Sequence, residues 1–251
     1  MSQYSAPPTE TPVRVSVRRP AAQPKVTYVI IGVTVVIYLL QMITKSALGI
    51  DYPLALGAKF NEAIQAGELW RFFTPMLLHS STTFLHIVFN MYALYSIGRQ
   101  LELFYGHWRY LALYLIGGFG GNVFSFIFST NPSVGASTAI FGLLAAEGVF
   151  LYHNRQMFGQ SANRALTNVI MIAAVNLMIG LSPGIDNFGH IGGLVGGGLF
   201  AWFAGPILGV VGVYPSFSAI DRRDKHSILM AGLGISAFFV LLAAGTLFIR
   251  R

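Results

Sequence analysis

The sequence contains no cysteine among its 251 residues. Disulfide bonds, thiol nucleophiles and cysteine-ligated metal sites are therefore excluded. Charge is also scarce: Asp, Glu, Lys and Arg together make up 10% of the chain, against about 25% in soluble domains. This shortfall, together with 54% hydrophobic residues, excludes a disordered chain and an ordinary soluble enzyme. It indicates a protein whose solvent is the lipid bilayer.

Seven apolar stretches have the length and composition that favour membrane-crossing helices. The first and the last, residues 26–44 and 227–249, contain no charged residue. The others are residues 84–98 (with an end near Glu102), 110–128, 137–152, 165–182 and 188–205. Residues 45–75 are too polar to span a membrane and too apolar for a plain linker. We predict an all-α polytopic membrane protein with seven transmembrane helices.

The formal net charge of +7 would suggest nucleic-acid binding in a soluble protein. If the N-terminus is cytoplasmic, the seven helices instead place most Lys and Arg residues in cytoplasmic segments. These residues are Arg14, Arg18, Arg19, Lys25, Arg99, Arg109, Arg155, Arg164, Arg222, Arg223 and Lys225. The positive-inside bias predicts a cytoplasmic N-terminus in a plasma membrane. Nucleic acid is not needed to explain the charge.

Two polar residues begin predicted helices at the same membrane depth. Ser137 lies in the run SVGASTAIFGLL and His190 in the run DNFGHIGGLVGGG. Polar side chains at membrane depth are costly and mark functional sites. A serine hydroxyl becomes a good nucleophile when a neighbouring base takes its proton, and histidine is suited to that task. The pair predicts nucleophilic catalysis. No pair of intramembrane Asp residues and no HExxH motif is present, which argues against aspartyl and zinc proteases.

Other residues fit acyl chemistry around this pair. His86 and Asn90 are four residues apart and share one helix face, where they could stabilise an oxyanion or simply bond helices together. Gly193 and Gly197 form a small-residue face that lets two helices approach closely. His79 could line an outer polar cavity or be a structural hydrogen bonder, and the sequence leaves both open. A metal site formed by His79, His86 and His190 has no recognisable spacing.

These motifs resemble those of the rhomboid family, in the same order along the chain. GASTAIFG resembles its GxSx nucleophile motif, GHIGGLVGG its histidine helix and HIVFN its HxxxN motif. Trp70 and Arg71 resemble its WR motif, and Glu102 resembles the acidic residue that ends the HxxxN helix. The resemblance covers residues 26–205. It implies a rhomboid-like six-helix bundle, to which residues 227–249 add a seventh, C-terminal helix.

The resemblance also implies roles for single residues. Ser137 is the expected nucleophile and His190 the expected general base, in a dyad without an aspartate. His86 and Asn90, with the Ser137 amide, are the expected oxyanion donors. Gly135 would shape the turn before Ser137. Phe141 stands where some relatives have a tyrosine stacked on the histidine, and Thr138 stands where many have glycine.

The implied organisation has four segments. Residues 1–25 form a basic, proline-containing cytoplasmic tail without the apolar stretch of a signal peptide. Residues 26–205 form the catalytic core, residues 206–226 a cytoplasmic loop and residues 227–251 the last helix. The expected activity is serine endopeptidase cleavage of transmembrane segments in single-pass membrane proteins near the outer face. No metal, other cofactor or nucleic acid is implied, and the oligomeric state stays open.

Two other functions compete with this one. An inactive rhomboid-like protein could bind client transmembrane segments without cutting them, and a small-solute transporter would be expected to show internal repeats. Trp70 and Arg71 are predicted to brace a loop, and Glu147 to be a structural ion or hydrogen bonder. Asn122 and Asn176 are predicted to form hydrogen bonds between helices.

Overall fold

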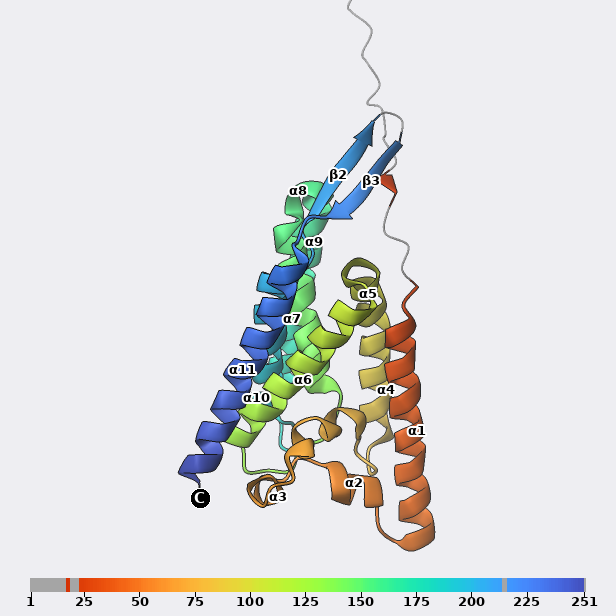
Figure 1. Ribbon diagram of the computed structural model, residues 1–251. Helices are drawn as coiled ribbons and strands as arrows, with labels where there is room; N and C mark the ends of the chain where they lie inside the picture. Colours follow the sequence, from red (N-terminus) through yellow and green to blue (C-terminus); the bar gives the residue numbers. More distant parts are fainter. Residues whose placement is uncertain (1–16, 19–22, 214–215, 251) are drawn as a thin grey trace, which may run out of the picture.

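Seven long helical segments lie side by side in the computed structural model, which describes residues 17–18, 23–213 and 216–250. They are α1 (Lys25–Leu48), α4 (Phe84–Ala93) with its continuations η3 (Leu94–Gly98) and α5 (Arg99–Tyr105), α6 (His107–Phe128), α7 (Ser137–His153), α9 (Gln160–Ile179), α10 (Asn187–Ala204) and α11 (Lys225–Ile249). Shorter helices are α2 (Tyr52–Gly57), α3 (Asn61–Gln65), η1 (Leu69–Phe72), η2 (Thr74–Leu77) and α8 (Arg155–Phe158). In Figure 1, α2 and α3 lie at one end of the bundle and α8 at the other.

Each predicted span coincides with one of these helical segments. α1, α6, α9 and α11 are by length and composition able to cross a membrane, and α7 is a shorter apolar helix. α10 and the α4–η3–α5 segment run in the same bundle (Figure 1). The predicted all-α polytopic membrane class is confirmed, and the protein is a multi-pass membrane protein.

Aspartates begin three of the helices. The side chains of Asp51, Asp186 and Asp224 accept hydrogen bonds from backbone amides in the first turns of α2, α10 and α11. The first backbone amides of a helix have no acceptor within the helix. A carboxylate at this position accepts a hydrogen bond from one of them, and its negative charge is stabilised by the positive end of the helix dipole. Capping explains why acidic residues lie at span ends in a chain with so few charges.

Glycines bring α6, α7 and α10 into backbone contact at the centre of the bundle. A Cβ placed on Gly117 of α6 would lie 3.2 Å from the Cα of Gly142 in α7. A Cβ on Gly192 of α10 would lie 2.5 Å from the carbonyl oxygen of Gly120. Larger residues would hold these helices apart, so the glycine content of the sequence reflects this close packing.

Glu102 joins α5 to the start of α1. Its buried carboxylate accepts hydrogen bonds from the backbone amides of Val26 and Thr27, both at 2.8 Å, and from the Thr27 hydroxyl at 2.7 Å. His107 lies 2.6 Å from the same carboxylate. The negative charge therefore sits at the positive end of α1 and fixes the first helix against the core.

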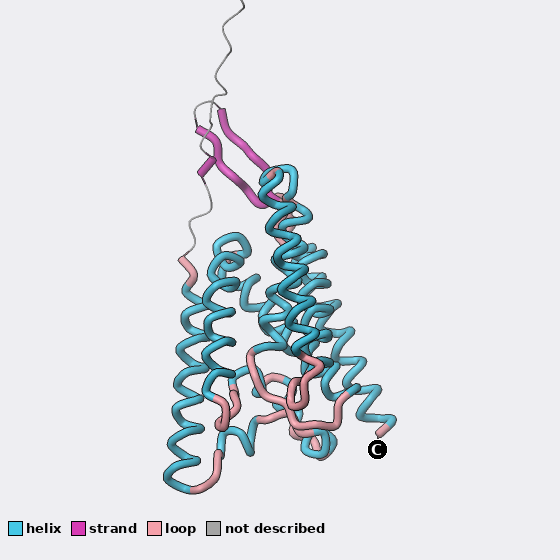
Figure 2. Tube along the Cα trace, turned by 180° about the vertical axis from the view of Figure 1, so that it is seen from behind, coloured by secondary structure: helices cyan, strands magenta, loops and turns pink. Residues whose placement is uncertain are grey.

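Residues 206–226, predicted as a cytoplasmic loop, contain two strands of a small sheet. β2 (Leu208–Val213) and β3 (Ser216–Asp221) pair antiparallel, and β1 (Val17–Arg18) pairs parallel with β3. The valines of β2 are β-branched and favour a strand. Figure 2 shows the strands at the end of the bundle opposite most of the loops. Most of the predicted tail, residues 1–16 and 19–22, lies outside the described residues.

Candidate active site

Ser137 and His190 lie in hydrogen-bond contact. Ser137 is the first residue of α7, and His190 lies in the first turn of α10. The Oγ of Ser137 is 3.0 Å from the Nε2 of His190. A Cβ on Gly193 would overlap the carbonyl group of Thr138, and a Cβ on Gly197 would lie 2.5 Å from the carbonyl carbon of Gly142. The two side chains meet because these glycines let α7 and α10 touch along their backbones.

An aromatic stack fixes the orientation of the His190 ring. The ring of Phe141 lies parallel to it, with centroids 4.1 Å apart and an interplanar angle of 11°. The Nδ1 of His190 is buried and has no hydrogen-bond partner in the part of the chain that the structure describes. No carboxylate there orients this ring from behind. Packing on Phe141 fixes this ring in the way that a third polar residue fixes the catalytic histidine of serine enzymes.

The turn before Ser137 requires glycine at position 135. Gly135 has φ = +132°, which side-chain-bearing residues rarely adopt. Its amide donates a 2.9 Å hydrogen bond to the carbonyl of Pro75. A Cβ there would lie 2.9 Å from the Nε2 of His86 and 3.6 Å from the Oγ of Ser137. Gly135 therefore lies between His86 and Ser137, and its lack of a side chain leaves space beside both.

His86 and Asn90 lie on the side of the site that α4 provides. The Nδ1 of His86 accepts a 3.3 Å hydrogen bond from the amide of Ser80. In a neutral imidazole with this acceptor, the Nε2 carries the hydrogen and donates toward the space beside Gly135. The amide nitrogen of Asn90 donates to the carbonyl of His86 at 2.8 Å, which uses one of its two hydrogens. The predicted oxyanion pair thus shares one face of α4.

His79 is enclosed by protein. Its side chain is fully buried, and its Nε2 accepts a hydrogen bond from the amide of Ala136 at 3.5 Å. The Gln41 side chain bonds both the amide and the carbonyl of His79, at 3.1 and 2.9 Å. Burial, and next the nearby His86, lower the pKa of His79 to about 3. These contacts favour the structural alternative for His79 over a water-lined cavity.

Lys59 holds the loop that leads to Ser137, a role that the sequence did not suggest. Its fully buried side chain donates to the carbonyls of Ser129 and Asn131, both at 2.9 Å. Its backbone forms a two-way bridge with Ser133. Burial lowers the pKa of Lys59 to about 8. Lys59 is one of several charged residues in its segment of the sequence. The sequence therefore does not distinguish it from a solvent-exposed lysine.

Trp70 and Arg71 brace the loop that contains α2, as predicted. The Arg71 guanidinium donates to the carbonyls of Ala55 and Ala58, and the Trp70 indole donates to the carbonyl of Leu56. Arg71 also pairs with Glu68 at 2.6 Å. These bonds satisfy backbone acceptors that have no helical partner.

Among the other predicted hydrogen bonders, only one joins two elements. The amide of Asn122 in α6 donates to the carbonyl of Phe72 in η1 at 2.8 Å. Asn176 donates to Ile172 in its own helix, so the predicted interhelical bond is wrong. Glu147, predicted to be a structural ion or hydrogen bonder, makes no hydrogen bond or ion pair with any described residue.

The sequence pattern of the rhomboid domain matches residues 66–207. This chain belongs to the rhomboid family. The matched residues run from the loop before η1 to just beyond α10. They include Ser137 and His190, and also His86 and Asn90 on α4. α1, most of the sheet and α11 lie outside the match.

Several curated rhomboids are similar to this chain. The rhomboid protease GluP of Bacillus subtilis is 38% identical over 218 residues, which cover 86% of this chain and 40% of GluP. RHOMBOID-like protein 1 of Arabidopsis thaliana is 37% identical over 187 residues, which cover 71% of this chain and 47% of that protein. RHOMBOID-like protein 6, mitochondrial, of the same plant is 42% identical over 144 residues, which cover 57% of this chain and 46% of that protein. The chain thus spans less than half the length of these relatives.

Proposed function

We propose that this rhomboid is an intramembrane serine endopeptidase with a Ser137–His190 dyad. The observation that carries the proposal is the 3.0 Å contact between the Ser137 Oγ and the His190 Nε2 at the adjoining ends of two membrane helices. Membership of the rhomboid family and the likeness to a relative named as a protease support it. No other serine hydroxyl is bonded to a histidine ring nitrogen among the described residues.

In the proposed reaction, the Nε2 of His190 accepts the hydroxyl proton while the Ser137 Oγ attacks the scissile carbonyl carbon. The negative charge moves to the carbonyl oxygen of the substrate. Amides in the first turn of α7 have no intrahelical partner and are free to donate to this oxygen, and the His86 Nε2 and Asn90 add donors. His190 then gives its proton to the leaving amine, and an acyl-enzyme remains. Water, with His190 again as base, hydrolyses this ester.

The substrates we propose are transmembrane segments of single-pass membrane proteins. A helix hides its carbonyls in internal hydrogen bonds, so the segment must unwind at the dyad before attack. Helix-weakening residues near the cleavage site are expected to favour this step. Ser137 closely follows Ser133, which bridges to Lys59 between α2 and α3. The dyad therefore lies toward the end of the bundle that carries α2 and α3, which Figure 1 shows opposite α8. With a cytoplasmic N-terminus in a plasma membrane, this end is the outer face.

The test is cleavage of a labelled single-pass substrate in liposomes, with the product mapped by mass spectrometry. Wild type is compared with Ser137→Ala, His190→Ala and the matched control Ser182→Ala, whose serine is exposed in the loop before α10. We expect cleavage and labelling by a fluorophosphonate for wild type and the control only. Folded wild type that neither cleaves several substrates nor takes up the probe would overturn the proposal and favour a client-binding protein.

A further inference from the structure

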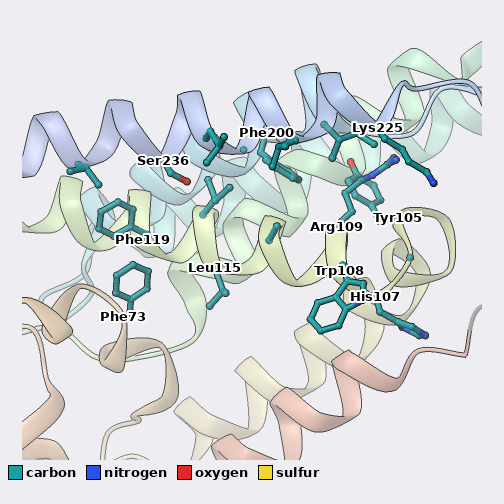
Figure 3. Close-up of a pocket in the computed structure, with 18 residues that line it drawn as sticks. Phe73, Tyr105, His107, Trp108, Arg109, Leu115, Phe119, Phe200, Lys225 and Ser236 are labelled. Carbon is teal, nitrogen blue, oxygen red and sulfur yellow. The ribbon is translucent and has the colours of Figure 1, made fainter.

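A groove runs between α6 and α11, on a side of the bundle that the proposed chemistry does not use. Its volume is about 810 Å³. Its long apolar part is formed by residues such as Leu115, Ile116, Phe119, Leu229 and Leu233. Figure 3 shows Phe73 and Phe119 at one end of the groove and Tyr105, Arg109 and Lys225 at the other. Apart from Ser236, which lies near Phe119 in Figure 3, the lining is therefore divided into an apolar length and a polar end.

The polar end of the groove contains a cation that has no partner among the described residues. Lys225, the first residue of α11, is exposed and has no hydrogen-bond or ion-pair partner there. The Tyr105 side chain is 5% exposed, and its hydroxyl is buried without a partner in those same residues. Arg109 pairs with Asp221 at 2.7 Å. Because the Tyr105 hydroxyl is closed to solvent, Lys225 is the donor that the polar end offers to an acceptor group of a ligand.

The position of the polar end matches a membrane surface. It lies at the start of α11, toward the end of the bundle where β2 and β3 are found (Figure 1). The apolar length extends from there along α6 and α11, both of which are able to cross a membrane. A ligand in this groove would have its polar group at headgroup level and its apolar part at the depth of the acyl chains. Basic residues at such a level attract anionic lipids.

We propose that the groove binds one anionic phospholipid. Its phosphate accepts a hydrogen bond from the Lys225 ammonium, and one acyl chain fills the apolar length between α6 and α11. The bound lipid fills the groove and contacts both helices. It thereby holds α11 against α6. The proposal is independent of the Ser137–His190 chemistry.

Two pairs of variants separate the headgroup from the chain. Lys225→Gln removes the free cation, and Arg164→Gln is its control because Arg164 is an exposed cation on α9, outside the groove. Gly232→Leu places a side chain in the groove, where a Cβ meets only Phe200 at 3.6 Å. Gly234→Leu is the matched control on the same helix, because a Cβ there meets nothing within 4 Å.

The experiment measures lipid binding to the full chain in detergent, by native mass spectrometry and by the shift of the melting temperature. The probes are phosphatidylglycerol, phosphatidylcholine with the same acyl chains, and glycerol phosphate. We expect one phosphatidylglycerol per chain and a higher melting temperature. We expect about fivefold weaker binding for Lys225→Gln, since one lysine near a membrane surface contributes about 1 kcal/mol. Gly232→Leu should lose the lipid, and both controls should match wild type.

Three results would overturn the proposal. Equal binding of phosphatidylcholine would show that the groove does not select an anionic headgroup. An equal response to glycerol phosphate would show a site for a soluble phosphate compound. Unchanged binding by Lys225→Gln and Gly232→Leu, with both variants folded by their melting curves, would show that the lipid lies elsewhere on the protein.

Discussion

Replacing Gly197 with alanine should separate α7 from α10 and abolish most of the reactivity of Ser137. A Cβ at this position would lie 2.5 Å from the carbonyl carbon of Gly142 and even closer to two further backbone atoms of that residue. Carbon atoms in contact prefer about 3.5–4.0 Å. Because the obstacle is backbone and not a flexible side chain, the helices must move apart by about 1 Å to relieve the overlap.

The dyad would be affected by a movement of this size. The Ser137–His190 contact of 3.0 Å would lengthen beyond hydrogen-bond distance if the whole displacement reached it. A misplacement of about 1 Å in an active site can reduce the rate about 100-fold. Overpacking of this kind costs about 1–3 kcal/mol of stability. We therefore expect fluorophosphonate labelling to slow by one to two orders of magnitude, with a lower melting temperature.

Gly198→Ala is the matched control. A Cβ at Gly198 would lie 3.6 Å from the Cβ of Ala145, which is an ordinary contact, so labelling and melting should stay near wild type. Both variants add one methyl group to neighbouring positions of the same helix. If Gly197→Ala labels at the wild-type rate and melts at the wild-type temperature, backbone contact between α7 and α10 does not position the dyad.

Three further predictions concern residues around the site. Burial holds the pKa of His79 at about 3 against an ordinary 6.5, so only the unfolded chain takes up this proton between those values. Stability should fall by about 1.4 kcal/mol per pH unit below 6.5 for this group, and His79→Gln should show a shallower fall in melting temperature. Lys59→Met should cost about 2–3 kcal/mol, measured by unfolding, because charge-assisted bonds to two carbonyls are lost. Phe141→Leu should slow fluorophosphonate labelling by about three- to tenfold through loss of the 4.1 Å stack.

Each of these predictions has a control. His226→Gln changes an exposed histidine and should leave the acid dependence as it is in wild type. An equally steep dependence in His79→Gln would contradict the buried neutral state. Lys25→Met removes an exposed cation, and a loss of stability equal to that of Lys59→Met would refute the importance of the loop bonds. Phe141→Tyr keeps the stacking face. If it slows fluorophosphonate labelling as much as Phe141→Leu does, stacking on this ring does not position His190.

The sequence predicted the helices and the contact between Ser137 and His190 because polar residues are conspicuous in apolar spans. Ser137 and His190 stood out from long uncharged surroundings, and Gly193 and Gly197 showed where two helices could touch. The part of the site that could not be predicted depends on long-range approach. The Lys59 side chain reaches carbonyls of a loop about 70 residues further along the chain, and no local pattern encodes such a contact.

Local ambiguity explains the other differences. Residues 207–220 are too short for a span and contain Pro215, so the sequence predicted only a loop, although the valines there pair as a strand with β3. Asn176 was expected between helices because of its depth, but asparagine can also bond the carbonyl four residues before it. A single sequence does not distinguish these two uses of an amide.

The pairing of β1 with β3 constrains the order of assembly during synthesis. Val17 precedes α1, and its partner Phe217 follows α10. The ribosome must therefore complete all the helices from α1 to α10 before this parallel contact can form, whereas N-terminal parts of a chain can fold earlier. Such a late, non-local closure is intrinsically slow. The strand pair thus closes only on a chain whose helices up to α10 have already been synthesised.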